Sequence, residues 1–363
     1  MEAADLSRPW AGRLPNPIVE LRWENWASGH RDVLLFDTFA TVTQPIELGG
    51  KRAARVAVAA SVAGSARATL DGTEREIDAE VVHRFLAVVR ERDRGQLLAQ
   101  HAQGLAELVR IVARRVAEGV AAEADLHKLE TERARVETEA ALAGIRAVRE
   151  LVPLAALTGW SPLPSAEALE RPAVPTHSVA DVTAAVTEAL VRRHDVRLAA
   201  ARLDAARQAL RFEHARGVPD LAVTGGLKRT SGYDTGVVSV IVPVPVFERN
   251  RAAIALARGQ VTAAELELEH TRRQADGEAR AALMTHAELA RRQTDAEARL
   301  VAPAMVVRAA ARSAFESGAG DLLRLVDAER VYADARMAVN ELTLDTILAS
   351  LDARLALARD VLP

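Results

Sequence analysis

Histidine is the residue type in this chain best suited to metal binding or proton transfer, and the nine histidines are scattered along the sequence. The sequence contains no His-Glu-x-x-His pair, no Gly-rich loop ending in Gly-Lys-Ser/Thr and no serine in a nucleophile elbow. His83, His101 and His127 stand singly in stretches that read as helix, where we expect surface or packing residues rather than metal ligands. The residue pattern therefore gives almost no support to an enzyme.

The composition excludes several further classes of protein. Cysteine is absent, which removes disulfides, thiolate metal sites and thiol nucleophiles. The formal net charge is -3, whereas a nucleic-acid-binding protein carries an excess of basic residues, so direct binding of DNA or RNA is not expected. Hydrophobic residues make up 49% of the chain but aromatic residues only 3%, so its helices are expected to pack through thin seams of small side chains.

Two similar corner segments lie 200 residues apart. Residues 44–52 read Gln-Pro-Ile-Glu-Leu-Gly-Gly-Lys-Arg, and residues 244–251 read Val-Pro-Val-Phe-Glu-Arg-Asn-Arg. In each, a proline closes a strand-like stretch and a basic corner containing Gly or Asn opens a helical one. We assign the corners to Pro45, Gly49, Gly50, Pro245, Arg249 and Asn250. The chain therefore reads as two structural repeats.

A pair of strands is expected before each corner. The first pair covers residues 18–26 and 33–43, and the second covers 221–228 and 235–245. Val238, Val240, Val242, Val244 and Val246 form a stripe with a period of two that is long enough to cross a hydrocarbon layer when tilted. Each repeat thus contributes one β-hairpin.

Long helical segments follow the corners, at residues 52–152, 251–302 and 305–362. Small apolar residues recur at three- and four-residue spacing, which is typical of coiled-coil-like packing. Glycine interrupts the pattern near Gly119 and near Gly318, so each repeat is expected to form a helical hairpin with a tip.

The expected division of the chain is a first repeat at residues 1–152, a linker at 153–177 and a second repeat at 178–363. The second repeat opens with a leading helix at about 178–215. Residues 1–14 leave no room for its counterpart and lack a basic start followed by an apolar stretch, so we expect a signal peptide and first helix in a longer form of the protein.

In their order and spacing these elements resemble the TolC family of outer-membrane efflux proteins, most nearly its CzcC-like heavy-metal branch. The resemblance covers residues 14–357 and is carried by residues 15–17, 44–52, 219–221, 242–251 and 315–327. It implies a mainly α fold in which long α-helical hairpins build a periplasmic tunnel. Four β-strands per chain would contribute to a trimeric twelve-stranded outer-membrane β-barrel.

The same resemblance implies a passive exit duct in the outer membrane, with no catalytic residue, cofactor or resident metal. Its partners would be two further copies of the chain, a periplasmic adaptor protein and an inner-membrane pump of the RND type. The adaptor would dock at the helical tips, on Gly119, Val120, Gly318 and Ala319. Asp327 and Arg324, just past the second tip, and Asp125, in the comparable place past the first tip, would lie at the periplasmic entrance of the pore.

Two other functions remain open at this stage. A TolC-like duct could serve drug efflux or type I secretion, because the duct itself need not select its cargo. A soluble helical scaffold or coiled-coil interaction protein would explain the Ala-rich helices, although it would not explain the strands.

Overall fold

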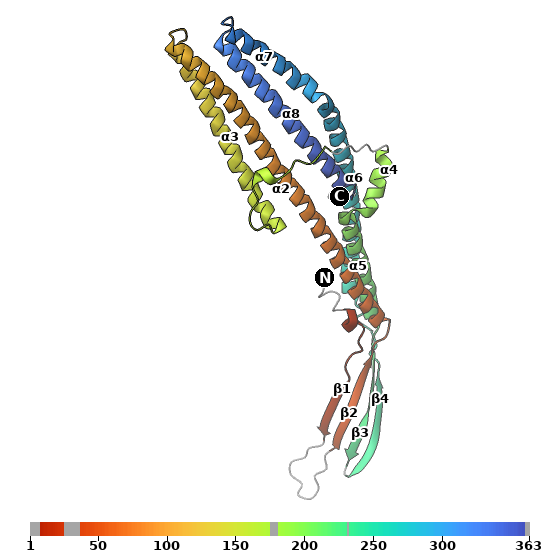
Figure 1. Ribbon diagram of the computed structural model, residues 1–363. Coiled ribbons are helices and arrows are strands. Elements are labelled where there is room, and N and C mark those ends of the chain that lie inside the picture. The colour runs from red at the N-terminus through yellow and green to blue at the C-terminus, as the bar shows by residue number, and fades with distance from the viewer. Residues whose placement is uncertain (1–7, 25–36, 175–180, 231, 360–363) are drawn as a thin grey trace. The chain divides into compact units, whose positions relative to one another are not determined.

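A computed structural model describes residues 8–24, 37–174, 181–230 and 232–359 (Figure 1). The chain forms two compact units, one from Met1–Gly72 with His194–Arg273, the other from Thr73–Arg193 with Gln274–Pro363. The fold is mostly helical with one four-stranded sheet, as the sequence predicted. The predicted division into repeats concerns similarity along the sequence, and it stays a prediction.

The first unit contains the sheet, whose strands are β1 (Ile18–Glu24), β2 (Asp37–Ile46), β3 (Leu221–Thr230) and β4 (Tyr233–Ile241). They pair antiparallel in the order β1-β2-β3-β4, so β2 and β3 join the two predicted hairpins into one sheet. Residues 25–36, which include part of the expected first hairpin, lie outside the described residues.

The end of β4 corrects one sequence prediction. The last strand was expected to reach residue 245 but ends at Ile241. Pro243 and Pro245 have no N–H group for a ladder with β3, and the N–H of Val246 donates instead to the carbonyl of Val244, 2.9 Å away.

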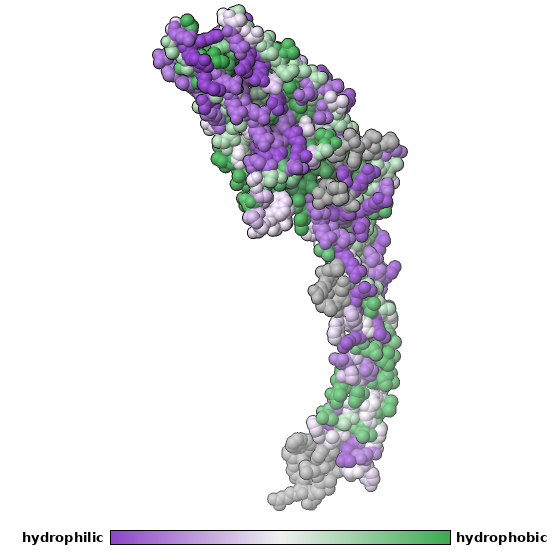
Figure 2. Space-filling model, viewed as in Figure 1, coloured by the Kyte–Doolittle hydropathy of each residue, from purple (hydrophilic) through white to green (hydrophobic). Residues whose placement is uncertain are grey.

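The two faces of the sheet differ in polarity, although Arg229 and Asp234 lie on the more apolar face and Ile18 and Ile241 on the more polar one. The register places one set of apolar side chains on one face, and these are exposed: Val19, Leu21, Trp23, Val42, Ile46, Leu227, Val238 and Val240. The other face carries the polar set: Glu20, Arg22, Glu24, Asp37, Thr41, Thr43, Thr224, Lys228, Thr235 and Ser239. Hydrophobic residues gather over the strands in Figure 2. Such an alternation suits a sheet with hydrocarbon on one side and water on the other.

Side chains on the polar face are bonded across the strands. Lys228 Nζ lies 2.9 Å from an Asp37 carboxylate oxygen, and the Thr43 and Thr224 hydroxyls lie 2.8 Å apart. The Phe39 ring lies between the Arg22 guanidinium at 4.4 Å and the Lys228 ammonium at 5.0 Å. These contacts fix the side chains of the polar face.

The first corner joins β2 to α2 (Lys51–Ala117) through two glycines with positive φ, Gly49 at 68° and Gly50 at 75°. Asp220 Oδ1 accepts hydrogen bonds from Lys51 Nζ at 2.6 Å and from the Leu48 N–H at 3.0 Å. Burial alone would raise the pKa of Asp220, but these two bonds favour the carboxylate and hold its pKa below the ordinary value.

The second corner repeats this backbone geometry before α6 (Arg251–Ala296). Asn250 has φ of 60°, and its side-chain amide donates to the Glu213 carbonyl at 2.8 Å. Gly50 and Asn250 each accept a hydrogen bond from the residue four positions on, Ala54 and Ile254. Arg249 donates to the carbonyl of Pro245 at 3.1 Å, which closes the turn.

The predicted leading helix is divided at Arg193 into α4 (Val182–Arg192) and α5 (His194–Arg216). Arg193 has ψ of 132°, so its backbone is extended and its buried guanidinium reaches Glu278 at 2.7 Å. Glu278 is itself nearly half exposed, so the ion pair is only partly buried, and the break occurs at a position without Gly or Pro.

The second unit contains two helical hairpins, the part of α2 after Gly72 with α3 (Glu123–Thr158), and α7 (Ala302–Glu316) with α8 (Leu322–Ala356). Two seams of buried Ala, Val and Leu join α2 and α3 to α8, and Phe315 of α7 enters the seam nearer the tips. Of the aromatic side chains that the structure describes, Phe315 alone is buried. At 67 residues α2 is roughly 100 Å long.

Two prolines correct the predicted helix limits. Pro153 was predicted to lie in a linker, but α3 continues through it to Thr158. Leu151 before the proline and Leu154 and Ala155 after it are buried, and this packing holds the helix together. Ahead of Pro303 the helix widens into a π turn, η2 (Glu297–Val301), so α6 and α7 form one nearly continuous rod. After α3 ends, the described part of the linker, residues 159–174, includes the short η1 (Ala166–Ala168).

None of the helices in the described segments is long and apolar enough to cross a membrane.

Substitution of Gly49 by Ala is expected to destabilise the first corner. A Cβ at Gly49 would lie 2.6 Å from the Val218 Cβ, whereas a Cβ at Gly50 would meet nothing within 4 Å. Because both sites have positive φ, Gly50→Ala is a control that carries the backbone strain alone. We expect about 1 kcal/mol of destabilisation for Gly50→Ala and about 2–4 kcal/mol for Gly49→Ala in denaturant unfolding. Equal losses would contradict the close packing against Val218.

Candidate functional site: the helical tips and the groove between them

The first tip is closed by backbone hydrogen bonds alone. Gly119, with φ of 74°, follows the end of α2, and its N–H donates to the Val116 carbonyl at 2.9 Å. The Val120 N–H reaches back to the Arg115 carbonyl, also at 2.9 Å. This pair of bonds is a Schellman motif, which requires a left-handed residue and therefore favours glycine.

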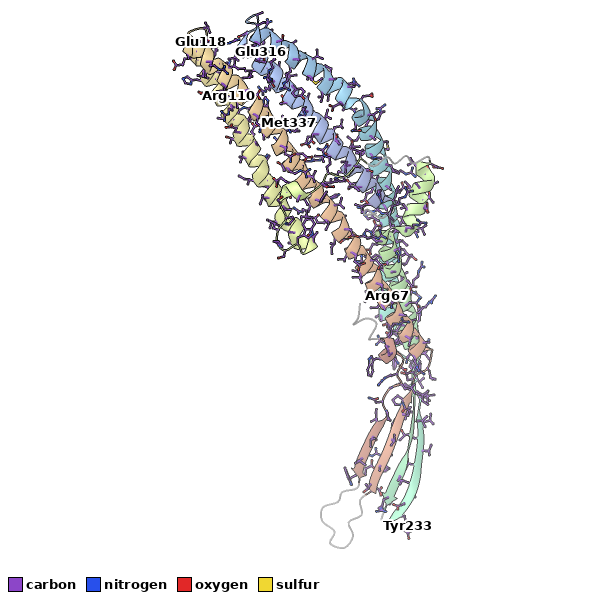
Figure 3. The ribbon with its side chains drawn as sticks, in the orientation of Figure 1. Arg67, Arg110, Glu118, Tyr233, Glu316 and Met337 are labelled. Carbon is purple, nitrogen blue, oxygen red and sulfur yellow. The ribbon has the colours of Figure 1, made fainter. Side chains whose placement is uncertain are left out.

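The second tip has the same motif. Gly318, with φ of 77°, donates to the Phe315 carbonyl at 3.2 Å, and Ala319 donates to the Ala314 carbonyl at 2.9 Å. Glu118 and Glu316 mark the two tips in Figure 3. The four residues predicted for adaptor docking are therefore brought together on adjacent tips, and all four are exposed.

The glycines of the tips differ in the space around them. A Cβ added to Gly119 or Gly318 would meet nothing within 4 Å, so these glycines serve backbone conformation only. A Cβ on Gly320 would lie 2.9 Å from the Phe315 backbone nitrogen. Gly320 was not among the residues predicted for the tips, although its position two residues after Gly318 is the signal of a tight turn.

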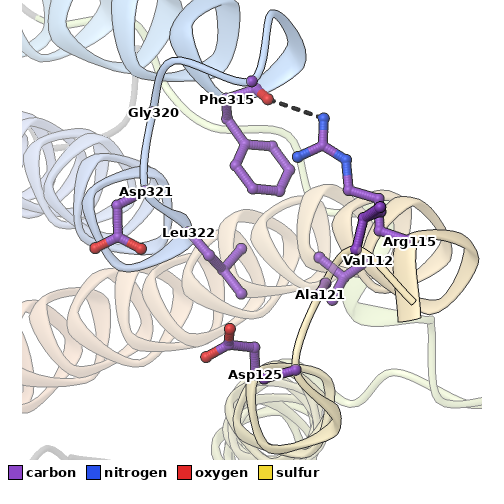
Figure 4. A pocket seen from close by; sticks show the side chains of 11 residues that line it. Val112, Arg115, Ala121, Asp125, Phe315, Gly320, Asp321 and Leu322 are labelled. Atoms are coloured by element: carbon purple, nitrogen blue, oxygen red, sulfur yellow. Dashed lines mark hydrogen bonds between the residues drawn. The ribbon is translucent and has the colours of Figure 1, made fainter. Parts of the chain in front are cut away.

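A groove of about 490 Å³ separates the two tips (Figure 4). Val112, Val120, Phe315 and Leu322 supply its apolar lining. Two carboxylates, Asp125 of α3 and Asp321 before α8, line it as well. Neither makes an ion pair within the described part of the chain, so the groove presents apolar surface next to negative charge.

Arg115 holds the two tips together across this groove. Its guanidinium donates to the Phe315 carbonyl at 2.9 Å and lies 4.3 Å from the centre of the Phe315 ring (Figure 4). The carbonyls at the end of α7 carry the negative end of the helix dipole, which favours a cation there. Sequence reasoning missed Arg115, because nothing local indicates that it contacts a residue 200 positions away.

The residues predicted for the pore entrance do not form one cluster. Asp125 lines the groove, whereas Asp327 and Arg324 lie on exposed positions of α8 and do not line it. No ion pair to Asp327 or Arg324 occurs among the residues that the structure describes. In a single chain, both charged side chains are therefore exposed to solvent.

A buried charge on α8 was also missed. Glu329 is only 3% exposed, and its carboxylate lies 2.8 Å from Arg308 Nε of α7. Arg308 lies 4.6 Å from the centre of the Tyr332 ring, and Glu329 Oε2 would lie in ordinary contact, at 3.9 Å, with a Cβ placed on Gly104 of α2. Glu329 follows the buried Leu325 by four residues, so helical periodicity was the available signal. This pair ties α7 to α8 and packs both against α2.

The three histidines have separate surroundings. His83 Nε2 lies 2.8 Å from Asp352, and His127 lies near Glu123 and Glu130 on the surface of α3. Burial favours the neutral imidazole of His101 and lowers its pKa. The nearby carboxylate of Glu329 acts in the opposite direction but is outweighed. Across the described segments, no group of three His, Asp or Glu side chains could hold a metal ion.

The comparison with known proteins decides the family. The profile of the outer membrane efflux protein family matches residues 23–160 and 185–359, which include β2, β3, β4 and both tips but only the last two residues of β1. The chain belongs to this outer membrane efflux protein family. Family members are efflux channels of the outer membrane, and the helical part of this efflux protein corresponds to their periplasmic tunnel.

Similar proteins cover most of this efflux protein. The cobalt-zinc-cadmium resistance protein CzcC of Cupriavidus metallidurans is 30% identical over 332 residues, which are 89% of this chain and 76% of the relative. The nickel-cobalt-cadmium resistance protein NccC of Alcaligenes xylosoxydans is 28% identical over 67% of this chain and 55% of its own length. The outer membrane protein VceC of Vibrio cholerae has the same fold, with a TM-score of 0.81 at 20% identity over 99% of this chain and 91% of its own.

Loss of the Arg115 side chain is expected to separate the tips of this efflux protein. Spin labels on cysteines at Glu118 and Glu316 would report the distance between the tips, and the chain has no native cysteine to interfere. In Arg115→Met, which removes a hydrogen bond and a cation–π contact worth about 1–3 kcal/mol together, we expect a broader distance distribution by pulsed electron spin resonance.

The matched control is Arg114→Met. Arg114 precedes Arg115 on the same helix but is exposed. Its substitution is expected to leave the distance distribution narrow. Equal broadening in both variants would show that Arg115 does not hold the tips.

Proposed function

We propose that this chain is the outer-membrane subunit of a tripartite efflux system and works as a homotrimeric, passive exit duct for heavy-metal cations. An RND-type pump in the inner membrane and a periplasmic adaptor protein would supply energy and selection. The chain would need no catalytic residue and no cofactor of its own. Its two structural repeats, at residues 1–152 and 178–363, would each supply one strand pair and one helical hairpin.

The observation that carries this proposal is the sheet. It has one exposed apolar face, one bonded polar face and two outer strands, β1 and β4, whose outer edges have no partner within the described chain. A backbone N–H or C=O left unpaired in lipid costs several kcal/mol, so only a closed ring of strands is stable there. Four strands cannot close by themselves, whereas three copies supply twelve.

The cargo is inferred from the relatives. CzcC and NccC are named for resistance to divalent metals, and the resemblance to CzcC extends over most of both chains. Three copies of Asp327 at the periplasmic entrance would present negative charge to an approaching cation, and Arg324 on the same helix would offset part of it. Asp125 would add its negative charge at the groove between the tips.

The exposure of Gly119, Val120, Gly318 and Ala319 supports the tips as the proposed adaptor site, and all of them except Val120 carry little or no side chain. Their backbones can therefore approach a partner closely. The groove beside them offers apolar surface together with the carboxylates of Asp125 and Asp321. This combination suits a partner that inserts apolar and basic side chains.

Complementation tests the duct function. The chain, fused to an outer-membrane export leader, is expressed in a bacterium that keeps the pump and adaptor of a metal efflux system but lacks its duct. We expect restored growth on cobalt, zinc or cadmium and lower cell-associated metal by mass spectrometry. Restored drug tolerance or protein secretion without restored metal tolerance would favour the other duct functions, and a soluble monomer in the fractionated cells would refute a duct.

A bulky residue at the second tip is expected to block adaptor docking. Gly318→Trp adds a large side chain where the space is open, so the helices should still fold. We expect at least a tenfold loss of adaptor cross-linking in whole cells. Gly318→Ala brings the same backbone strain without the bulk and should retain docking. Normal cross-linking of Gly318→Trp would show that the adaptor binds elsewhere.

A further inference from the structure

The corner between β4 and α6 combines a groove, an exposed apolar run and an arginine that makes no ion pair among the described residues. We propose that this corner binds the phosphate of an anionic phospholipid in the periplasmic leaflet of the outer membrane, with Arg249 as the main contact. The acyl chains of the lipid would lie along the apolar face of the sheet. This inference rests on the proposed function, because the sheet must lie in the membrane, and it adds a lipid site that conduction does not require.

The apolar face of the sheet continues past the end of β4. Val242 and Val244 each precede a proline, which favours extended backbone, so the alternation of the strand is kept. Their exposed fractions are 58% and 76%, and Phe247 at the corner is 98% exposed. Apolar surface of this kind is unfavourable in water, and the acyl chains of a lipid would cover it.

The length of the apolar run matches the thickness of a membrane. At its far end Asp234 forms an ion pair with Arg229 at 2.7 Å, and both side chains lie on the more apolar face. From Asp234 to Val244 the chain advances roughly 33 Å, at about 3.4 Å per residue in β4 and about 3.1 Å in the extended segment after it. Strands tilted by about 35–45° then span roughly 23–27 Å, and the outward-facing apolar bands of membrane barrels are about 25 Å tall. The corner therefore lies where hydrocarbon meets the phosphate groups.

A groove of about 490 Å³ opens at this boundary, between the turn after α5 and residues 243–250. Arg216 and Arg249 line it together with apolar side chains that include Val244 and Phe247. Because α6 begins at this end of the sheet and the helical part corresponds to the periplasmic tunnel, the boundary belongs to the periplasmic leaflet. The groove thus combines apolar surface with guanidinium groups, as the phosphate end of a phospholipid requires.

The guanidinium of Arg249 is held in place by one of its donors. Its Nε donates to the Pro245 carbonyl at 3.1 Å, whereas neither terminal nitrogen has a partner among the described residues. The neighbouring Glu248 carboxylate accepts from the Asn250 N–H instead. The backbone is also fixed, because a Cβ on Gly217 would lie 3.0 Å from the Arg249 carbonyl oxygen. Guanidinium groups bind phosphate oxygens through paired N–H donors, so this arginine can hold a phosphate without first breaking an ion pair.

The charges around Arg249 favour an anion. Arg251, the first residue of α6, is exposed and makes no ion pair within the described chain. Arg216 lies 3.0 Å from the Glu213 carboxylate, which also accepts from the Asn250 side-chain amide at 2.6 Å. Three arginines at this corner therefore stand against the carboxylates of Glu213 and Glu248, both already engaged by hydrogen bonds. A lipid with net negative charge, such as phosphatidylglycerol, fits this excess of positive charge better than a neutral one.

Lipid binding to the purified protein tests the site. The chain, exported with the leader used for complementation, is extracted from outer membranes in non-ionic detergent and titrated with phosphatidylglycerol. Bound lipid is counted by native mass spectrometry. We expect saturable binding whose affinity falls about fivefold in Arg249→Gln, which is the contribution of one basic residue beside an anionic lipid surface. Equal affinity of the unmodified chain and Arg249→Gln would overturn the proposal.

Two further variants serve as controls. Arg249→Lys keeps the positive charge and should retain most of the affinity. Arg258→Gln removes an exposed arginine further along α6 that makes no ion pair within the described segments, and it should bind lipid as the unmodified chain does. A loss in Arg258→Gln as large as that in Arg249→Gln would indicate attraction to positive charge in general and would refute a site at the corner.

Two further ligands separate the possible sources of phosphate. Diacylglycerol, which has the same acyl chains without the phosphate, should bind at least fivefold more weakly than phosphatidylglycerol. Excess inorganic phosphate should not displace the lipid, because phosphate alone leaves the apolar run uncovered. Displacement by inorganic phosphate would identify a simple anion site and would overturn the lipid proposal.

The mass of each variant in detergent, measured by light scattering, separates these outcomes from a failure of the proposed function. If Arg249→Gln converts trimers into monomers but binds lipid normally, the corner contacts a neighbouring copy and the lipid site is refuted. A trimer whose lipid binding does not depend on Arg249 leaves the duct function intact. A water-soluble monomer that binds no lipid would refute the duct function and the lipid site together.

Discussion

Backbone groups at the edge of a sheet need partners, and in lipid no water can supply them. In this protein the constraint falls on β1 and β4, because the two inner strands satisfy each other through nine consecutive rungs. An exposed apolar face and an unsatisfied edge would make a single copy prone to aggregation. Further strands at both edges are thus a condition for the sheet to be stable in the membrane, which the proposed homotrimer would meet.

The helical part follows a different physical principle. Its seams contain Ala, Val and Leu, and the single buried aromatic ring among the described residues lies beside the tips. Small side chains let long helices approach closely along their whole length, which a core built around large rings would not allow. Polar contacts between hairpins, such as Arg308 with Glu329 and Arg115 with Phe315, then fix the pairing of helices whose apolar seams are nearly uniform.

Local signals in the sequence predicted much of this architecture. The glycines at Gly119 and Gly318 predicted the tips because a left-handed residue is needed to close a helix, and alternating valines predicted the last strand. Prolines were less reliable, since α3 continues through Pro153 where buried neighbours outweigh one lost hydrogen bond. The contacts of Arg115, Arg193 and Glu329 could not be predicted, because each joins segments that are far apart in the sequence.

The two Schellman tips have a consequence for evolution. Each turn is closed by main-chain atoms, and its glycine is the only residue type on which the local backbone depends. The side chains at Val120 and Ala319 project outward and contribute nothing to closing the turns. Mutations at these positions can therefore accumulate without a cost in folding, so, with an adaptor docked there as proposed, a duct of this design could exchange one docking protein for another through single-residue steps.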